Sequence, residues 1–298
     1  MSESPSIGWI GTGMMGGPMA GHLLDAGYEL AVFNRTASRA DDLVARGARR
    51  AAGPADAAAG ADIVVTMVGF PTDVRDTILA LDGALAAMAP GTLLVDMTTS
   101  EPTLAVEIHA AASVRDVAAL DAPVSGGDLG ARNAALVIMA GGDRGAFARA
   151  EPLFAVLGRS ATWQGGPGTG QHAKMVNQIA IASGMIGLCE AMLYARRAGL
   201  DVERVIDTIK DGAAGSWSLS NYGPRMLRSD LEPGFKIDHF VKDLGVALLE
   251  ARRMKLPLVG TALAEQLYVA AQSQGFGQKG TQALLVTLDR LAGEVPAG

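Results

Sequence analysis

The residues best suited to chemistry lie in the stretch GTGQHAKMVNQ, residues 168–178. Lys174 stands at the start of a segment that contains no charged side chain from its next residue to Cys189. On a helix, offsets of three and four would place three amide side chains on the face of Lys174, namely Gln171, Asn177 and Gln178. An amine there can donate a proton to a substrate oxygen or accept one from it. We therefore take Lys174 as a candidate acid/base catalyst, with a lysine that extends its amine into water as the alternative.

A glycine-rich stretch near the N-terminus has the spacing of a phosphate-binding loop. Gly11, Gly13 and Gly16 follow an expected strand and precede an expected helix, and Met14 and Met15 lie between them. In that context the first glycine permits a tight turn, the second lets the backbone approach a pyrophosphate, and the third allows close packing of helix on sheet. The helix N-terminus then presents N–H groups to the phosphates. The pattern predicts a dinucleotide site, with a chance match among 38 glycines as the alternative.

The residues after the second expected strand bear on the choice of cofactor. An NAD-preferring loop places Asp or Glu there for the ribose 2′-hydroxyl, whereas this chain has Asn34, Arg35 and Thr36. A guanidinium can hold a 2′-phosphate with two hydrogen bonds, and the threonine hydroxyl can support it. We therefore expect NADP(H), with NAD as the alternative if Arg35 is an ordinary surface residue.

Composition narrows the classes of protein that the chain can belong to. Net charge is −6 and aromatic residues make up 5%, which argues against a nucleic-acid surface. No uninterrupted run reaches the roughly 20 apolar residues of a membrane helix. Cys189 is the only cysteine and the four histidines are scattered, so neither a disulfide nor a metal site is expected. The acidic start MSESPSIGWIG is unlike an export signal, so we expect a cytoplasmic protein.

Short apolar runs alternate with helical stretches up to Gln164. Strands are expected at Ile7–Ile10, Leu30–Phe33, Ile63–Val68, Leu93–Met97, Val117–Leu120, Leu136–Ala140 and Ala161–Trp163. Helices are expected between them at Met15–Ala26, Ser38–Arg46, Pro71–Leu79, Glu101–Ala112 and Gly145–Leu157. Strands that are apolar on both faces and alternate with helices indicate an α/β fold of the Rossmann type, a doubly wound parallel sheet.

The rest of the chain is helical in pattern. Helices are expected at 170–198, 202–211, 217–228, 239–254, 258–273 and 280–292. The first is nearly apolar all round in its middle, as in the core of an all-helical domain or of a dimer. Trp217, at helical spacing, is more typical of a core than of a pocket wall. We therefore predict a dinucleotide-binding domain, residues 1–164, an all-helical domain, residues 165–298, and a homodimer or homotetramer.

Four stretches together resemble the signatures of the β-hydroxyacid dehydrogenases, the family of 3-hydroxyisobutyrate dehydrogenase, tartronate semialdehyde reductase, and the glyoxylic and succinic semialdehyde reductases. IGWIGTGMMGGPMAGHLL (7–24) is similar to the family's cofactor signature and DAPVSGG (121–127) to its substrate loop. GTGQHAKMVNQ (168–178) is similar to its catalytic helix and KDLGVAL (242–248) to its C-terminal signature. The stretches occur in the family's order, and the likeness runs over nearly the whole chain.

The resemblance implies a role for particular residues. Lys174 would be the catalytic lysine and Asn177 would orient the substrate, while Lys242 would lie near the nicotinamide in an environment set by Asp243. The substrate carboxylate would be held by Ser125, Gly126 and Gly127, whose backbone N–H groups can form an anion nest. The dinucleotide would also contact Val68, Gly69 and Thr99.

The implied reaction is hydride transfer between NADP(H), or NAD(H), and a small β-hydroxy acid or semialdehyde. Burial and a second cation would lower the pKa of Lys174. Asn133 and Ala134 replace a more usual Gly-Thr, which leaves the identity of the substrate open. Two alternatives are a non-catalytic dinucleotide-binding module for sensing or assembly, and a relative of the imine reductases, which typically lack the helix lysine.

Overall fold

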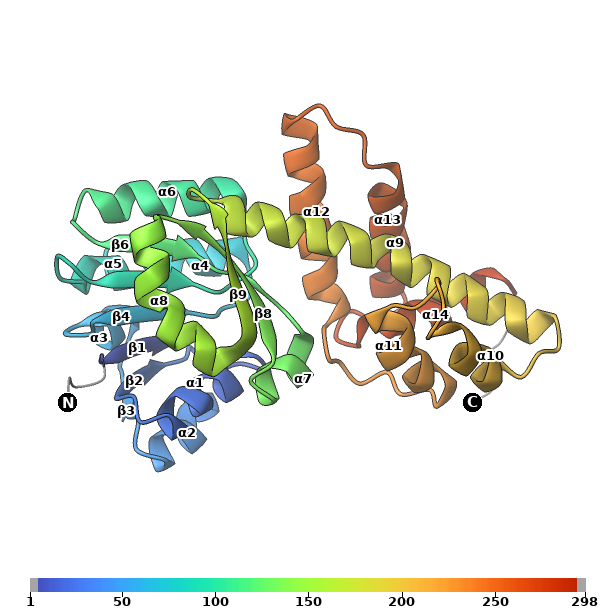
Figure 1. Cartoon of the computed structure of the whole chain (residues 1–298), viewed down its shortest axis with the longest axis horizontal. Coiled ribbons are helices and arrows are strands. Elements are labelled where there is room, and N and C mark those ends of the chain that lie inside the picture. Colours follow the sequence, from blue (N-terminus) through green and yellow to red (C-terminus); the bar gives the residue numbers. More distant parts are fainter. Residues whose placement is uncertain (1–4, 294–298) are drawn as a thin grey trace. The chain divides into compact units, whose positions relative to one another are not determined.

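The structure, a computed structural model, describes residues 5–293 and divides into two compact units after Lys174. The first unit holds the sheet and its covering helices, and the second is all-helical (Figure 1). The helix α9, Thr169–Arg197, begins in the first unit and continues through the second. A functional boundary between residues 164 and 165 stays a prediction.

A mixed, mainly parallel sheet forms the centre of the first unit. Its strands run in the order β3-β2-β1-β4-β5-β6-β8-β7, with β9 paired to β8. Their bounds are β1 Ile7–Ile10, β2 Leu30–Phe33, β3 Arg49–Arg50, β4 Ile63–Thr66, β5 Leu93–Asp96, β6 Ala118–Asp121, β7 Val124–Ser125, β8 Leu136–Gly142 and β9 Gly158–Gly165. This arrangement confirms the Rossmann-type class.

One part of the sheet differs from the all-parallel expectation. Strand β8 runs antiparallel to β6 and to β7, while β9 returns parallel to β8. The link 126–135 between β7 and β8 is too short for a parallel crossover, which needs a dozen residues or more. The chain therefore turns back at this point and adds an antiparallel edge.

Helices cover both faces of the sheet (Figure 1). The helices of the first unit are α1 Gly16–Asp25, η1 Ala37–Ala40, α2 Asp41–Ala45, α3 Pro54–Ala58, α4 Pro71–Leu79, α5 Ala84–Ala87, α6 Pro102–Ser113, α7 Gly127–Arg132 and α8 Arg144–Leu157. On one face Ile7 packs in a cluster with α1 and α8, and on the other Ile10 packs in a cluster with α3, α4 and α6. Burial on both sides explains why the strands are continuous apolar runs.

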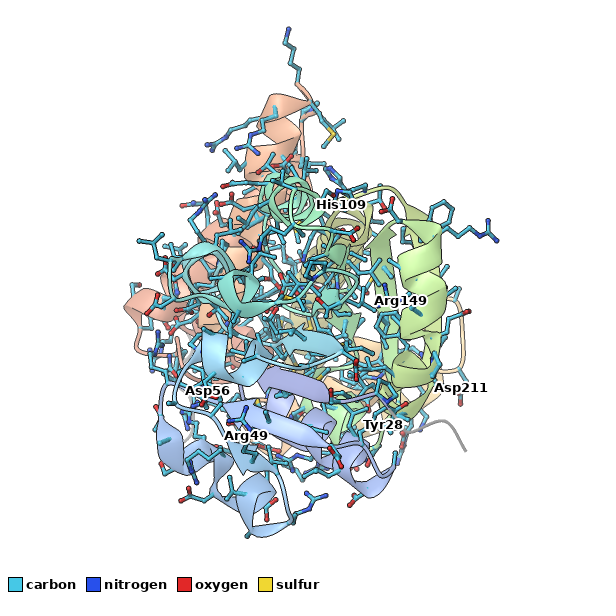
Figure 2. All side chains as sticks on the ribbon, turned by 90° about the vertical axis from the view of Figure 1, so that its left-hand side faces the viewer. Tyr28, Arg49, Asp56, His109, Arg149 and Asp211 are labelled. Carbon is cyan, nitrogen blue, oxygen red and sulfur yellow. The ribbon has the colours of Figure 1, made fainter. Side chains whose placement is uncertain are left out.

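The elements that the sequence pattern did not indicate are short, and polar contacts join two of them, β3 and α3. Arg49 of β3 lies beside Asp56 of α3 (Figure 2) and donates to its carboxylate at 2.9 Å and its carbonyl at 2.8 Å. Asp56 also accepts a hydrogen bond from the Ala52 amide at 2.7 Å. An exposed strand of two residues has no apolar periodicity from which it could be predicted.

The helices of the second unit pack around a large apolar core. Besides α9 these are α10 Val202–Ile209, α11 Trp217–Leu227, α12 Ile237–Arg253, α13 Val259–Ser273, η2 Thr281–Ala283 and α14 Leu284–Leu291. Phe240 of α12 meets Tyr268 of α13 edge to face, with ring centroids 4.9 Å apart. Trp217 is 51% exposed and contacts Tyr222 edge-on, so its expected place in the core was wrong.

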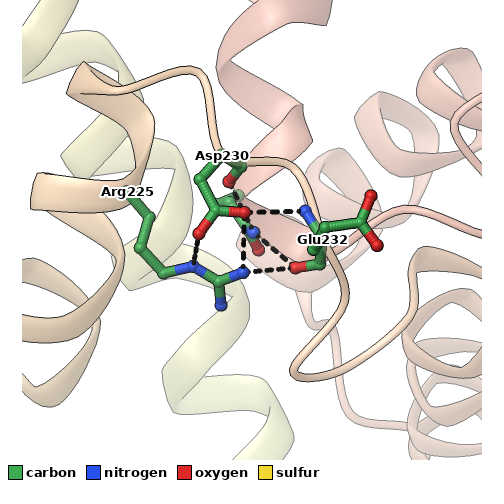
Figure 3. A network of polar contacts seen from close by, with 4 residues as sticks. Arg225, Asp230 and Glu232 are labelled. Atoms are coloured by element: carbon green, nitrogen blue, oxygen red, sulfur yellow. Dashed lines mark hydrogen bonds and ion pairs between the residues drawn. The ribbon is translucent and has the colours of Figure 1, made fainter.

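A polar network closes the loop between α11 and α12 (Figure 3). The Arg225 guanidinium donates to the Asp230 carboxylate at 2.8 Å and to the Glu232 carbonyl. Gln282 donates to the carbonyls of Asp230 and Glu232, both at 3.0 Å. The Arg225 side chain lowers the pKa of Asp230, so the loop is fixed by charge as well as by backbone contacts.

By length and composition alone α9 is apolar enough to cross a membrane, and 33% of its most apolar window is buried. Met185, Cys189 and Met192 on this helix belong to the core of the second unit. The first turn of α9 is hydrogen-bonded to the sheet of the first unit. We therefore describe α9 as a core helix with one exposed face.

Candidate functional site

Two glycines of the phosphate-binding loop are required by the packing of the protein itself. Gly11 has φ +101°, and a Cβ there would lie 2.1 Å from the Met67 carbonyl oxygen. A Cβ on Gly16 would lie 2.0 Å from the Gly11 carbonyl oxygen. These positions exclude side chains because β1, β4 and α1 approach one another closely, as the spacing predicts.

Gly13 has a different explanation. Among the described residues, only the Arg39 guanidinium comes within 4 Å of a Cβ built there, at 3.9 Å. The fold does not need glycine at this position, whereas a ligand that approaches the backbone would. α1 begins beside it without a side-chain cap and without an acidic residue in its first turn, which leaves backbone N–H groups for an anion. These residues fit a dinucleotide pyrophosphate.

The other predicted cofactor residues of the first unit lie at the same edge of the sheet. Asn34, after β2, accepts a hydrogen bond from the Thr12 amide at 3.0 Å. Val68, after β4, donates its amide to Thr98 at 3.0 Å. Gly69 follows Val68 and Thr99 follows Thr98, while Met14 and Met15 lead into α1. This is the carboxyl edge at the reversal of strand order between β1 and β4, where ligands bind in such sheets.

The two arginines after β2 are placed differently. Arg35 is largely exposed and forms an ion pair with Asp73 of α4 at 3.0 Å. Thr36, also exposed, receives a hydrogen bond on its carbonyl from Asn34. Arg39 points its guanidinium toward Gly13. Arg39 was not among the predicted cofactor residues, although a second arginine four residues after Arg35 could have indicated it.

The turn predicted to bind a carboxylate joins β7 to α7. Ser125 ends the strand, Gly126 has φ +139° and Gly127 has φ +62°. Both angles lie in the region that favours glycine, so the backbone can turn there without a side chain over its N–H groups. Asp128 in the next position is paired with Arg132 at 3.4 Å, which offsets its negative charge beside the predicted anion-binding turn.

Lys174 lies in the second turn of α9 and is 7% exposed. Gln171, one turn earlier, is fully buried. The Gln171 side chain donates to the Thr98 carbonyl at 2.7 Å and accepts from the Ser100 amide at 2.9 Å. The amine therefore follows a turn of helix that is fixed to the sheet, and its burial does not match a lysine extended into bulk water.

Asp121, the last residue of β6, was not among the predicted site residues. Its carboxylate accepts hydrogen bonds from the amides of Gly168 and Gln171, both at 2.8 Å. Burial raises the pKa of Asp121 to about 6, against the effect of these two hydrogen bonds. The acidic residue after an apolar strand was the only sequence signal for this contact.

The predicted residues of the second unit, Asn177 and Lys242, are half-buried and joined through the buried Gln178 and Asp243. Asn177 donates to Gln178 at 2.7 Å, and Gln178 donates to Asp243 at 2.6 Å. The other oxygen of Asp243 pairs with the Lys242 ammonium at 2.9 Å. Burial and the charge of Lys242 lower the pKa of His239. The sequence placed Asp243 beside Lys242 but did not indicate that Gln178 joins Asn177 to that pair.

The lone cysteine and the potential metal-ligand side chains form no further candidate site among the described residues. Burial raises the pKa of the Cys189 thiol, which lies in the core of the second unit. Within residues 5–293, no group of three or more His, Cys, Asp or Glu side chains could hold a metal ion.

Comparison with known protein families shows to which family the chain belongs. Residues 6–165 match the NAD-binding domain of 6-phosphogluconate dehydrogenase. Residues 168–288 match the NAD-binding domain described for NADP-dependent 3-hydroxyisobutyrate dehydrogenase. The chain belongs to the β-hydroxyacid dehydrogenase family. It is an NAD(P)-dependent hydroxyacid oxidoreductase.

Individual relatives cover almost the whole β-hydroxyacid dehydrogenase chain. An Arabidopsis thaliana protein named probable 3-hydroxyisobutyrate dehydrogenase-like 1, mitochondrial, is 53% identical over 97% of this chain and 86% of its own. The NAD-dependent L-serine dehydrogenase of Pseudomonas aeruginosa is 39% identical over 97% of this chain and 99% of its own. A solved Mycobacterium tuberculosis 3-hydroxyisobutyrate dehydrogenase with L-serine has a TM-score of 0.86 at 30% identity, covering 95% of this chain and 99% of that one.

Proposed function

We propose that this enzyme interconverts small β-hydroxy acids and their semialdehydes with NADP(H), with Lys174 as the acid/base catalyst. The observation that carries the proposal is the placement of Lys174. It is buried and follows a helix turn that Asp121 holds against the end of β6, and the chain continues from Asp121 through β7 into the Ser125–Gly127 turn. We propose that a proton donor and an anion-binding turn are thereby linked through Asp121.

The proposed reaction assigns a role to each predicted site residue. A bound nicotinamide supplies or accepts the hydride. In reduction, the Lys174 ammonium donates a proton to the carbonyl oxygen and stabilises the negative charge that develops there. In oxidation, the neutral amine accepts the hydroxyl proton. The backbone N–H groups of Ser125, Gly126 and Gly127 bind the substrate carboxylate. Asn177 orients the substrate, and Lys242, fixed by Asp243, acts near the nicotinamide.

The preference for NADP(H) rests on the cations after β2. Arg35 and Arg39 can bind a 2′-phosphate, with the Thr36 hydroxyl in support. No carboxylate stands at the position of Asn34, where an NAD-preferring loop has one. Asp73 competes for Arg35. NAD is the second candidate, since the Pseudomonas relative is named NAD-dependent.

Assembly into a homodimer or homotetramer is supported by the surface of α9. Small residues form an exposed stripe along it at helical spacing, namely Ala180, Ser183, Gly184, Gly187 and Ala191. Val176 and Tyr194, at the two ends of this stripe, are 68% and 75% exposed. A second α9 could pack closely against small residues of this kind, since they let helix backbones approach.

We place the enzyme in the cytoplasm. Its one cysteine, Cys189, is buried and unpaired, which suits a reducing compartment. The Arabidopsis relative is named mitochondrial, so a mitochondrial location is the alternative.

One experiment separates the proposed function from its alternatives. The purified enzyme is assayed with a panel of short semialdehydes and 3-hydroxy acids, using NADPH and NADH, and with cyclic imines as a second panel. We expect turnover of a small carboxylate substrate and a higher kcat/KM with NADPH. Turnover of imines alone would favour an imine reductase, and cofactor binding without turnover of either panel would favour a sensing module.

A further inference from the structure

The Asp121 carboxylate joins two parts of the first unit that the proposed function uses. Asp121 ends β6, four residues before Ser125. One carboxylate oxygen accepts from the Gly168 amide and the other from the Gln171 amide, each at 2.8 Å. Gly168 directly precedes α9, and Gln171 lies three residues before Lys174. Both ends of this contact therefore lie within a few residues of a proposed substrate-binding or catalytic group.

The side chain of Gln171 makes a second attachment of the same turn. It donates to the Thr98 carbonyl at 2.7 Å and accepts from the Ser100 amide at 2.9 Å. Thr98 and Ser100 follow β5, the neighbour of β6 in the sheet. The start of α9 is thus attached to the ends of two adjacent strands, and all of these groups are buried.

Glycines let the helix start approach the sheet closely enough for these contacts. A Cβ on Gly170 would lie 2.4 Å from the Asp121 carbonyl oxygen and 2.5 Å from that of Met139. A Cβ on Gly141 of β8 would lie 2.6 Å from the Gly170 amide nitrogen. Close contact on both sides leaves the first turn of α9 no room to shift while the hydrogen bonds persist.

We propose that Asp121 and Gln171 are positioning residues that set the place of the Lys174 amine relative to the Ser125–Gly127 turn. The inference rests on the proposed role of Lys174 in proton transfer. Burying a carboxylate is unfavourable unless its oxygens are hydrogen-bonded. Here both oxygens accept amides at the helix start, where four backbone N–H groups lack partners within the helix and the dipole favours a negative charge. A neutral amide at residue 121 could satisfy only one of them.

The first test is Asp121→Asn, which keeps the shape of the side chain but turns an NH2 group toward one of the two amides. We expect kcat to fall by about 10- to 100-fold, because a displacement of about 1 Å at a reacting group has costs of that order. The Kd for NADPH should stay within about twofold, since the glycine loop follows β1, which β4 and β5 separate from β6 in the sheet. Gln171→Met, which removes both side-chain hydrogen bonds and leaves Asp121 intact, should lower kcat in the same way.

A matched control separates positioning from general loss of stability. Asp289 is a buried carboxylate of the second unit that accepts hydrogen bonds from Arg196 at 2.9 and 3.1 Å. Asp289→Asn should lower Tm while leaving kcat unchanged. Amide hydrogen exchange in the cofactor-free protein gives a readout apart from activity, and exchange at Gly168 and Gln171 should accelerate in Asp121→Asn.

The decisive readout is a double-mutant cycle with Lys174→Ala. If Asp121 acts through Lys174, Asp121→Asn should reduce the residual kcat of Lys174→Ala by less than about twofold. An equal loss in both backgrounds would overturn the proposal, as would wild-type kcat in both Asp121→Asn and Gln171→Met. A wild-type enzyme that turns over neither hydroxy acid nor semialdehyde would refute the proposed function, a result distinct from either of these.

Discussion

At the scale of single residues, the glycine loop shows two different reasons for the same amino acid. Gly11 and Gly16 are glycine because neighbouring backbone would collide with a Cβ at 2.1 and 2.0 Å. At Gly13 the nearest described atom is the end of the Arg39 side chain, at 3.9 Å. The first pair is explained by folding, and for Gly13 we propose the close approach of a dinucleotide as the reason.

This difference gives a prediction for two alanine variants. Gly11→Ala forces a Cβ into the Met67 carbonyl at a φ of +101°, so it should lower the free energy of unfolding by at least about 2 kcal/mol. Gly13→Ala should leave that free energy within about 0.5 kcal/mol and weaken NADPH binding at least tenfold. Urea unfolding and fluorescence titration with NADPH measure the two effects. Unchanged NADPH affinity in Gly13→Ala would contradict the proposal that a dinucleotide approaches the backbone closely at Gly13.

Individual residues also show what the sequence could not indicate. Lys174, Asn177 and the glycines are recognisable because their types and spacing are local. The bonds from Asp121 to the start of α9 connect residues 47 and 50 positions apart. No local pattern encodes a contact of that range, which exists only because β6 ends where α9 begins.

At the scale of elements, the apolar strands and the periodic helices were predicted well. β1, β2 and α4 have the expected bounds, and α9 starts and ends within one residue of them. β3 and β7, each of two residues, were missed, because so short a strand depends on its neighbours in the sheet. The reversal of β8 was also missed, because the direction of a strand depends on the length of its connection, here the link between β7 and β8.

The contact between β6 and α9 makes stability depend on pH. Burial, with a further contribution from Asp96, raises the pKa of Asp121 from 3.8 to about 6, although the two amides lower it. The folded protein therefore binds this proton more tightly than the unfolded chain, and its contribution to stability falls as pH rises from about 4 to about 6. A shift of that size corresponds to about 3 kcal/mol.

Asp121→Asn has no proton to lose at this position. Relative to wild type, its free energy of unfolding should therefore rise by up to about 3 kcal/mol between pH 4 and pH 7. Denaturant titrations of both proteins across this range measure the difference. Parallel curves would show that Asp121 does not titrate in this window, and would contradict the role assigned to its burial.

At the scale of the whole molecule, the change from a sheet to helices was predicted from the change in pattern near Gly165, while the structure divides after Lys174. Strands buried on both faces give way to helices around a large apolar core, and the buried side chains of each unit form clusters of their own. The number of chains in the assembly does not follow from the sequence pattern in this way, because an exposed stripe of small residues on α9 does not identify the surface that packs against it.

The proposed dimer can be tested on that stripe. A side chain at Gly187 meets nothing within 4 Å in the single chain, so Gly187→Arg should fold normally and block a second α9. Sedimentation equilibrium should give at least twice the 30.6 kDa chain mass for wild type and the mass of one chain for the variant. Gly145→Arg, on α8 and equally open, is the matched control and should assemble like wild type. A monomeric wild type would contradict the proposal.

In the proposed reaction, the Lys174 amine transfers the proton that accompanies hydride transfer. The most direct measurement compares Lys174→Ala with wild type, using the best substrate of the panel, and records kcat together with the Kd for NADPH. We predict that kcat falls between about 100- and 10,000-fold, the contribution of a positioned acid/base group, while the Kd stays within about twofold. A variant that retains wild-type kcat at saturating substrate would contradict the account.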